Sequence, residues 1–339
     1  MHQLTYGDVK AAADRIAGRV RPVVLSPADP GEFLGGPGGD RAREDCEVWL
    51  ALEFLQHTGS FKARGAQNFL QAHREAGSLP GAGVTIASGG NAGLACAWAA
   101  GQQGVPATVF LPATAPAVKV ARLRGFGAEV RLVGTEYADA LAACGDFAAT
   151  TGALASHAYD HPLIAAGAGT VLEEIVRQVP GLDTVVVAVG GGGLFAGVAT
   201  AARHHGVRVV AVEPENCRAL NAAIGAGHPV DVTVDSVAAD ALGARRASAT
   251  ALRAAQRGDV RTVLVSDTEI VRARRALWDQ RRIAVEHAAA TALAALPTAT
   301  RPQVGGGGYR PSAGEKLAVV LCGANTDPGD LTPVHADRA

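Results

Sequence analysis

One lysine of this sequence stands where a side-chain amine could react. Lys62 follows the turn Thr58-Gly59-Ser60 and lies between Phe61 and Ala63, at the start of a predicted amphipathic helix that runs to about Glu75. Partial burial at such a place would lower the pKa of the lysine amine, as an amine nucleophile requires. An ordinary solvated lysine in the first turn of a helix is the alternative, and other stretches of the chain must decide between them.

A run of four glycines is the second candidate. Gly190-Gly191-Gly192-Gly193 follows an apolar stretch and precedes a helix predicted to begin near Leu194. Glycine lets successive backbone N–H groups turn toward one point at a helix N-terminus, where the helix dipole also favours an anion. The run therefore predicts a phosphate site. It lacks the Lys-Ser/Thr of a P-loop, but a loose Gly-x-Gly-x-x-Gly match with Glu213 as ribose ligand keeps a dinucleotide site as an alternative.

Two further stretches place polar groups at the ends of predicted strands. Ser88-Gly89-Gly90-Asn91 joins a strand to a helix, so its free N–H groups could hold a carboxylate. Ser88 or Asn91 could also simply cap that helix. Cys322-Gly323-Ala324-Asn325 follows the last predicted strand, at the edge where open α/β sheets bind ligands. A lone cysteine there is otherwise a small buried apolar residue.

A regular alternation of strands and helices positions these stretches. Strands are predicted at 47–52, 84–87, 107–111, 129–133, 184–189, 208–212 and 317–321. Helices are predicted at 7–19, 62–75, 91–103, 117–125, 135–150, 163–178, 194–204, 217–226, 249–256, 270–280 and 286–295, with an irregular connection at 21–37. Such alternation predicts parallel sheets with right-handed crossovers. A second, larger α/β unit is predicted to begin after the His-rich turn at 156–162.

Composition and charge exclude several classes of protein. The 339 residues carry a net charge of −1, which gives no electrostatic surplus for nucleic acid or an anionic membrane. No apolar segment follows a basic start, so no secretory signal is predicted and a cytoplasmic protein is expected. The five cysteines include no Cys-x-x-Cys pair, which favours reduced thiols over a zinc site or disulfide framework. The uncharged run 184–202 approaches the length of a membrane span, but its glycines predict strand, turn and helix.

Taken together, these stretches resemble the fold type II family of pyridoxal-phosphate enzymes, and within it the serine/threonine dehydratases, closest to the serine dehydratase branch. Several motifs in the family's order are far more specific than any one of them. The motifs are Thr58-Gly-Ser-Phe-Lys-Ala-Arg-Gly-Ala66, Ser88-Gly-Gly-Asn-Ala-Gly-Leu-Ala95, Val189-Gly-Gly-Gly-Gly-Leu194, Val212-Glu-Pro214, Ser236-Val-Ala-Ala-Asp-Ala-Leu-Gly243, Val285-Glu286 and Cys322-Gly-Ala-Asn325.

The resemblance implies an α/β fold of the tryptophan synthase β type, with two doubly wound open sheets and the cofactor between domains. Residues 1–52 and 156–339 would form a large domain that binds pyridoxal phosphate. Residues 53–155 would form a small domain that binds the substrate carboxylate. A homodimer is implied as well.

The same resemblance implies a role for each candidate residue. Lys62 would be the catalytic residue and hold pyridoxal 5′-phosphate covalently, with Phe61 packed against the pyridine ring. Asn91 would hydrogen-bond the phenolic oxygen of the ring, and Cys322 would face the pyridine nitrogen. The phosphate would be bound by the N–H groups of Gly190, Gly191, Gly192, Gly193 and Leu194. The substrate would be bound by Ser60, Ser88, Gly89, Gly90 and Asn91.

The implied activity is β-elimination of L-serine, L-threonine or both, to pyruvate or 2-oxobutanoate and ammonia. Lys62 would remove the α-proton as general base. A neutral thiol at Cys322 cannot keep the pyridine nitrogen protonated, which favours prompt elimination over transamination. Related racemases carry a serine where Gly89 stands, and glycine has no proton to give, so efficient racemisation is not expected. Glu213 resembles a ligand of a cation site, and a monovalent ion is expected there, because Ala219 replaces the second acidic residue of the divalent site.

Three alternatives stay open from the sequence. A lyase or β-replacement enzyme for another β-substituted amino acid, such as 3-hydroxyaspartate, or a racemase would share the fold. A nicotinamide oxidoreductase would explain the glycine run and Glu213, but it leaves Lys62 and the Ser88 stretch without a role. An inactive binding protein is disfavoured by the intact Lys62.

Overall fold

The strands of the computed structural model form two separate sheets. The structure describes residues 3–29, 32–33, 46–296 and 308–331. One sheet has six strands, in the spatial order β1 (Leu25–Pro27), β2 (Glu47–Ala51), β10 (Lys316–Val320), β7 (Thr184–Ala188), β8 (Arg208–Pro214) and β9 (Val260–Val265). The other has four, in the order β5 (Glu129–Leu132), β4 (Ala107–Leu111), β3 (Val84–Ala87) and β6 (Leu154–Ala155).

All neighbouring strands pair in parallel except β1, which runs antiparallel to β2. The predicted parallel sheets are therefore confirmed, with one antiparallel edge strand. Parallel sheets bury both faces, and their strands are accordingly rich in β-branched residues: every residue of β7, whose sequence is TVVVA, is buried.

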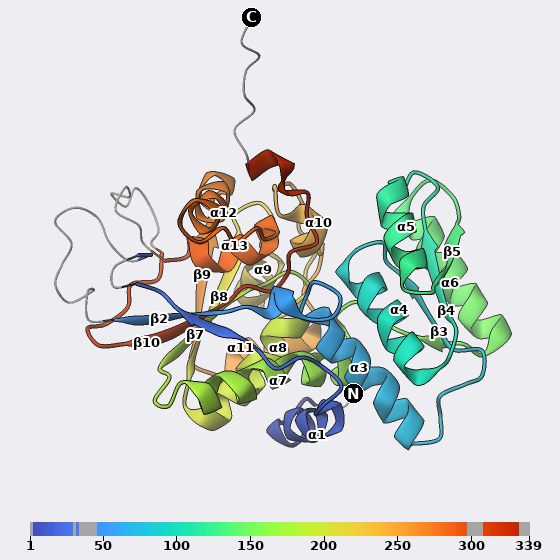
Figure 1. The fold of residues 1–339 in the computed structure, drawn as a ribbon, viewed down its shortest axis with the longest axis horizontal. Coiled ribbons are helices and arrows are strands. Elements are labelled where there is room, and N and C mark those ends of the chain that lie inside the picture. Colours follow the sequence, from blue (N-terminus) through green and yellow to red (C-terminus); the bar gives the residue numbers. More distant parts are fainter. Residues whose placement is uncertain (1–2, 30–31, 34–45, 297–307, 332–339) are drawn as a thin grey trace, which may run out of the picture.

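Helices cover the sheets on their faces (Figure 1). Those around the smaller sheet are α4 (Asn91–Gln103), α5 (Ala117–Gly125) and α6 (Tyr137–Thr151). Those around the larger sheet are α1 (Tyr6–Ile16), α7 (Pro162–Gln178), α8 (Gly193–His205), α9 (Ala219–Ala226), α10 (Ala239–Leu242), α11 (Ala249–Arg257), α12 (Asp267–Arg281) and α13 (His287–Ala294). Two short 3-10 helices are η1 (Glu53–Leu55) and η2 (Pro328–Leu331).

Helix α3 (Lys62–Glu75) lies between the two groups of elements in Figure 1 and packs on both α4 and α7. Helices α7 and α8 cross where Gly169 meets Gly197, and a Cβ atom on either glycine would overlap the backbone of the other helix. Only glycine permits this close approach. The crossing fixes the direction of α8 and so positions the four-glycine run at its start.

Several predicted limits differ from the structure, each for a local reason. The connection predicted as irregular at 21–37 contains β1, a three-residue edge strand that carries too short a pattern to be recognised. Strands β6 and β9 were not predicted either. The helix predicted from 270 begins at Asp267, because Ser266 and Glu269 form a capping box. The helix predicted from 217 begins at Ala219, where Glu213 accepts hydrogen bonds from its first turn.

No helix in the described ranges is long and apolar enough to cross a membrane. The uncharged run 184–202 is divided between β7, the glycine run and α8, as predicted.

Candidate active site

Lys62 is brought to the end of β10 by pairing between two loops. The N–H of Phe61 donates to the carbonyl of Cys322 at 2.9 Å, and the N–H of Ala324 donates to the carbonyl of Gly59 at 2.9 Å. These bonds flank an antiparallel bridge between Ser60 and Gly323. The turn before α3 and the stretch after β10 therefore lie side by side, although they are far apart in the sequence.

The amine of Lys62 is held in place and its charge is disfavoured. Its Nζ donates to the carbonyl oxygen of Ala158 at 2.7 Å and lies 4.9 Å from the centre of the Phe61 ring. Burial lowers the pKa of Lys62 from 10.5 to about 8, although the nearby carboxylate of Glu286 acts in the opposite direction. A substantial fraction of this lysine is thus neutral near pH 8, as a nucleophile or general base requires.

The four-glycine run forms an open cradle at the start of α8. Gly192 has φ +93°, which favours glycine. Within the described ranges, the N–H groups from Gly190 to Leu194 donate to no protein acceptor. A small cavity of about 10 Å³ is lined by both Lys62 and the first residues of α8, Gly193 and Leu194. The structure therefore brings the predicted amine and the predicted anion cradle to one place.

The Ser88 stretch lies at the junction of β3 and α4, as predicted. Asn91 is the first residue of α4, and the N–H groups of Ser88, Gly89 and Gly90 have no acceptor in the part of the chain that the structure describes. Unpaired N–H groups at a helix N-terminus suit a carboxylate. No side chain at Ser88 or Asn91 caps the helix, so the capping alternative does not apply.

Asn91 is part of a hydrogen-bond network that also includes Glu286 and Asn325. The Nδ2 of Asn91 donates to both oxygens of Glu286 at 2.9 Å, and its Oδ1 accepts from the Nδ2 of Asn325 at 2.7 Å. The backbone N–H of Asn325 donates to Glu286 at 2.8 Å. Burial raises the pKa of Glu286, and these hydrogen bonds oppose that rise. Any ligand contact made by the Asn91 amide would compete with this network.

Two buried groups near Lys62 are chemically notable. Burial raises the pKa of the Cys322 thiol to about 12, so this residue is neutral at ordinary pH. The hydroxyl of Ser60 is fully buried and has no hydrogen-bond partner among the described residues. A buried polar atom without a partner is costly, so this hydroxyl is free to bond a group that enters the site.

Glu213 has a separate structural role at the end of β8. Its oxygens accept the N–H groups of Leu220 and Asn221 at 2.7 and 2.8 Å, which caps the first turn of α9. Burial raises the pKa of Glu213 to about 7. Across the described ranges, no group of three or more His, Cys, Asp or Glu side chains could hold a metal ion.

Several residues that define the site were not predicted to have a role in it. The carbonyl of Ala158 holds the Lys62 amine, and the ring of Tyr159 covers Gly191 so closely that a Cβ atom there would overlap it. Both residues lie in the segment predicted only as a His-rich turn. Glu286 and Asn325 belong to two of the motifs that resemble the family, and this was the signal that could have identified them. Their hydrogen bonds to Asn91 were not predicted.

Comparison with known proteins adds an independent finding. A family described as "Pyridoxal-phosphate dependent enzyme" matches residues 39–323. The chain is 35% identical over 335 residues to an L-threonine ammonia-lyase of Geobacter sulfurreducens, covering 98% of this chain and 78% of that protein. It is 37% identical over 284 residues to a human protein named serine dehydratase-like, covering 82% and 85% of the two chains. Among solved structures, maize serine racemase superposes with a TM-score of 0.85 at 27% identity, covering 97% and 96%.

Proposed function

This chain belongs to the family of pyridoxal-phosphate dependent enzymes, and from that premise we propose that it dehydrates and deaminates L-serine, L-threonine or both. The products would be pyruvate or 2-oxobutanoate, with ammonia. The proposal rests on one observation: the Lys62 amine, whose pKa is lowered to about 8, lies at the same small cavity as the unpaired N–H groups of the four-glycine run. Membership of this family leaves the nicotinamide alternative without support.

The residues present fit the cofactor of the family. The unpaired N–H groups from Gly190 to Leu194 suit a phosphate, and the cradle has no room for a side chain at Gly191. The unpartnered hydroxyl of Ser60 points to a bound group in the same region. Lys62 would hold the cofactor covalently and Phe61 would lie beside its ring. When bound, pyridoxal phosphate supplies an aldehyde that captures the substrate amine and a ring that accepts the electron pair of the α-carbon.

Lys62 would act as the general base of the reaction. The carbonyl of Ala158 orients its Nζ, and the lowered pKa keeps a neutral fraction ready to take the α-proton. The electron pair freed at the α-carbon would then form a double bond to the β-carbon, and the β-hydroxyl would leave as water with the proton that Lys62 took up. The enamine that remains is hydrolysed to a 2-oxo acid and ammonia.

The loop from Ser88 to Asn91 would hold the substrate carboxylate on its unpaired N–H groups, together with Ser60. Orientation of this carboxylate fixes which face of the α-carbon meets Lys62. Cys322, a neutral thiol, would lie at the pyridine nitrogen and favour elimination over transamination.

Racemisation is the second candidate, because a racemase is among the similar structures. It requires an acid on the face of the α-carbon opposite Lys62. Gly89 offers no such group; Leu111 and the stem of Lys119 lie beyond its Cα, and the Lys119 amine is held in an ion pair with Asp240. We therefore propose elimination as the main activity, and a lyase for another β-substituted amino acid such as 3-hydroxyaspartate as the alternative substrate class.

The experiment compares the purified holoenzyme with Lys62→Ala, and with Lys10→Ala as a matched control on an exposed lysine. We expect the wild type and the control to show the visible absorption of a lysine-bound cofactor and to release oxo acid and ammonia from L-serine or L-threonine. Lys62→Ala should lose that absorption, and its turnover should fall by at least about a hundredfold. Unchanged turnover in Lys62→Ala, or formation of the D-amino acid as the main product, would contradict the proposal.

We extend the proposal to the assembly, compartment and ions of the enzyme. We expect a homodimer in the cytoplasm; the exposed apolar side chains Val24 and Leu55, at 48% and 42%, support an intersubunit surface. The two sheets would serve as the large cofactor domain (1–52 and 156–339) and the small domain (53–155). A monovalent cation would bind near Glu213 through the remaining lone pairs of its carboxylate and nearby carbonyls.

A further inference from the structure

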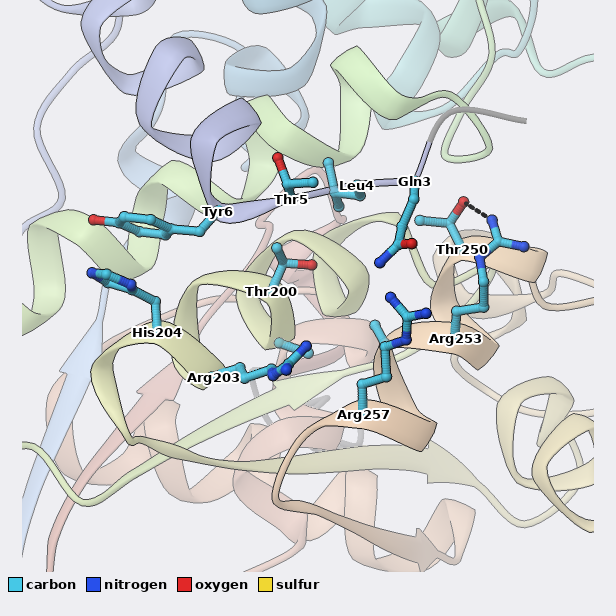
Figure 2. A pocket seen from close by; sticks show the side chains of 12 residues that line it. Gln3, Leu4, Thr5, Tyr6, Thr200, Arg203, His204, Thr250, Arg253 and Arg257 are labelled. Carbon is cyan, nitrogen blue, oxygen red and sulfur yellow. Dashed lines mark hydrogen bonds between the residues drawn. The ribbon is translucent and has the colours of Figure 1, made fainter.

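A second cavity lies away from Lys62, on the surface formed by the chain start, α8 and α11 (Figure 2). Its volume is about 300 Å³. Three arginines line it, Arg203 from α8 and Arg253 and Arg257 from α11, and we call it the arginine cavity. No aspartate or glutamate is among the described residues that line it.

The positive charges of this cavity are not neutralised by the protein. Arg203 and Arg257 have no hydrogen-bond or ion-pair partner in the described ranges, and Arg253 donates only to the hydroxyl of Thr250, at 3.3 Å. Arg253 and Arg257 are also four residues apart on one helix, a spacing at which like charges destabilise the helix. By contrast, the well-buried Arg64 and Arg274 both pair with carboxylates. Arg203 and Arg257 are exposed to solvent and Arg253 is half-buried, so water solvates their charges, and all three guanidinium groups remain available to an anion.

Neutral hydrogen-bonding groups surround the same hollow. In Figure 2 the side chain of Arg257 points toward the carboxamide of Gln3, and Arg203 lies below Thr200. At one edge, Tyr6 stacks on His204 with ring centres 3.6 Å apart. The nearby carboxylate of Glu173 is already engaged by the Tyr6 hydroxyl and by His205. Convergent arginine and amide donors around a concave site are typical of oxyanion recognition.

We propose that the arginine cavity binds a small polyanion, one whose phosphate or carboxylate groups bridge at least two of the three arginines. A volume of about 300 Å³ suits a metabolite rather than a polymer. Arg203 lies ten residues beyond the start of α8, about 15 Å along the helix axis, and the arginine cavity shares no lining residue with the cavity at Lys62. The site is therefore distinct from the cofactor and substrate site.

Both helices that line the cavity also contact the four-glycine run. Helix α8 begins there, and the residue before α11, Ser248, donates its N–H to the carbonyl of Gly191 at 3.0 Å. Ala251 of α11 packs directly against Gly192. A ligand that fixes α8 against α11 thus acts on elements that support the cradle.

The test is calorimetric titration of the holoenzyme, in which cofactor already fills the cradle, with inorganic phosphate, pyrophosphate and citrate at low ionic strength. We expect saturable binding of at least one of them. Arg253→Gln/Arg257→Gln should weaken that binding by at least about tenfold, because each charged hydrogen bond contributes on this scale. The control Arg272→Gln/Arg275→Gln removes the same charge from exposed positions of α12 and should leave it unchanged.

The three probes separate the two sources of the anion. Pyrophosphate binding more tightly than citrate assigns the cavity to a phosphorylated ligand, and the reverse order assigns it to a polycarboxylate. Absence of binding with all three anions would overturn the proposal. Equal weakening of binding in the two double variants would also overturn it, because the loss would then reflect the net charge of the protein and not the arginines of the cavity. Melting curves of both variants establish that the comparison is made between folded proteins.

Discussion

The chemistry of this protein depends on single residues whose surroundings change their charge. Lys62 is the clearest case, because burial lowers the pKa of its amine to about 8 while the carboxylate of Glu286 opposes the change. The pKa of Cys322 shifts in the opposite direction, because burial favours the neutral thiol and raises its pKa to about 12. One buried region therefore holds a partly neutral amine and a neutral thiol at the same pH.

The lowered pKa of Lys62 predicts how fast the cofactor-free chain takes up pyridoxal phosphate. Only the neutral amine reacts, so the rate should rise with pH, by about tenfold per unit in the acidic limb, and level off above a midpoint near pH 8. Stopped-flow absorbance measures it. Glu286→Gln removes a charge that raises the pKa of Lys62, so its midpoint should lie at lower pH. A midpoint near 10.5 in the wild type would refute the prediction.

At the scale of elements, α3 is held by buried charges rather than by apolar packing alone. Arg64 is fully buried, and it pairs with Glu53 of η1 and Glu174 of α7, each at 2.6 Å. Its Nη1 also contacts the hydroxyl of Thr170 at 3.2 Å. This pairing fixes the first turn of α3, and hence Lys62, against α7 and the turn after β2.

Arg64→Leu should therefore lower the free energy of unfolding by about 3 to 5 kcal/mol, because Glu53, 1% exposed, is left buried without its partner. Urea denaturation measured by circular dichroism tests this. The double variant Arg64→Leu/Glu53→Leu should recover part of the loss. Lys10→Leu, which breaks an exposed ion pair on α1, should change the free energy by no more than about 0.5 kcal/mol. Equal losses in Arg64→Leu and Lys10→Leu would show that burial of the pair is unimportant.

At the scale of the whole molecule, polar contacts join the helices around the smaller sheet to the elements around the larger sheet. Glu286, between α12 and α13, binds Asn91 at the start of α4 and Asn325 after β10. Lys119 of α5 forms an ion pair with Asp240 of α10, and both side chains are exposed to solvent, at 34% and 73%. The buried network should govern how firmly the Ser88 stretch is held against Lys62, since exposed ion pairs contribute little.

Glu286→Ala leaves the Asn91 amide and the Asn325 N–H without their acceptor. We expect backbone amide exchange at the start of α4 and around Asn325 to accelerate by about tenfold or more. Hydrogen–deuterium exchange with mass spectrometry measures this. Lys119→Met, the matched control on the exposed contact between the same two units, should change it little. The prediction fails if Glu286→Ala exchanges like the wild type, or if both variants accelerate alike.

The sequence alone determined most of the fold and the position of the reactive groups along it. Strands β3 and β4 and helices α4 and α5 have the predicted limits, because apolar periodicity and terminal glycines are local signals. The candidates Lys62, Gly190 to Gly193 and Ser88 to Asn91 were found because each stands at a junction between strand and helix or at the start of a helix. Short edge strands such as β1 and β6 were not predicted, because two or three residues are too few to show an alternation of apolar and polar side chains.

Only the tertiary structure decided what those groups touch. Lys62 meets the Ala158 carbonyl 96 residues away, and Asn91 meets Glu286 195 residues away. The arginine cavity arises from three segments that no local pattern connects. A pKa depends on burial and on neighbouring charges, and both are fixed by packing between distant elements. The sequence by itself thus determined which residues stand ready for chemistry, while the packing decided their protonation, their partners and the second, positively charged cavity.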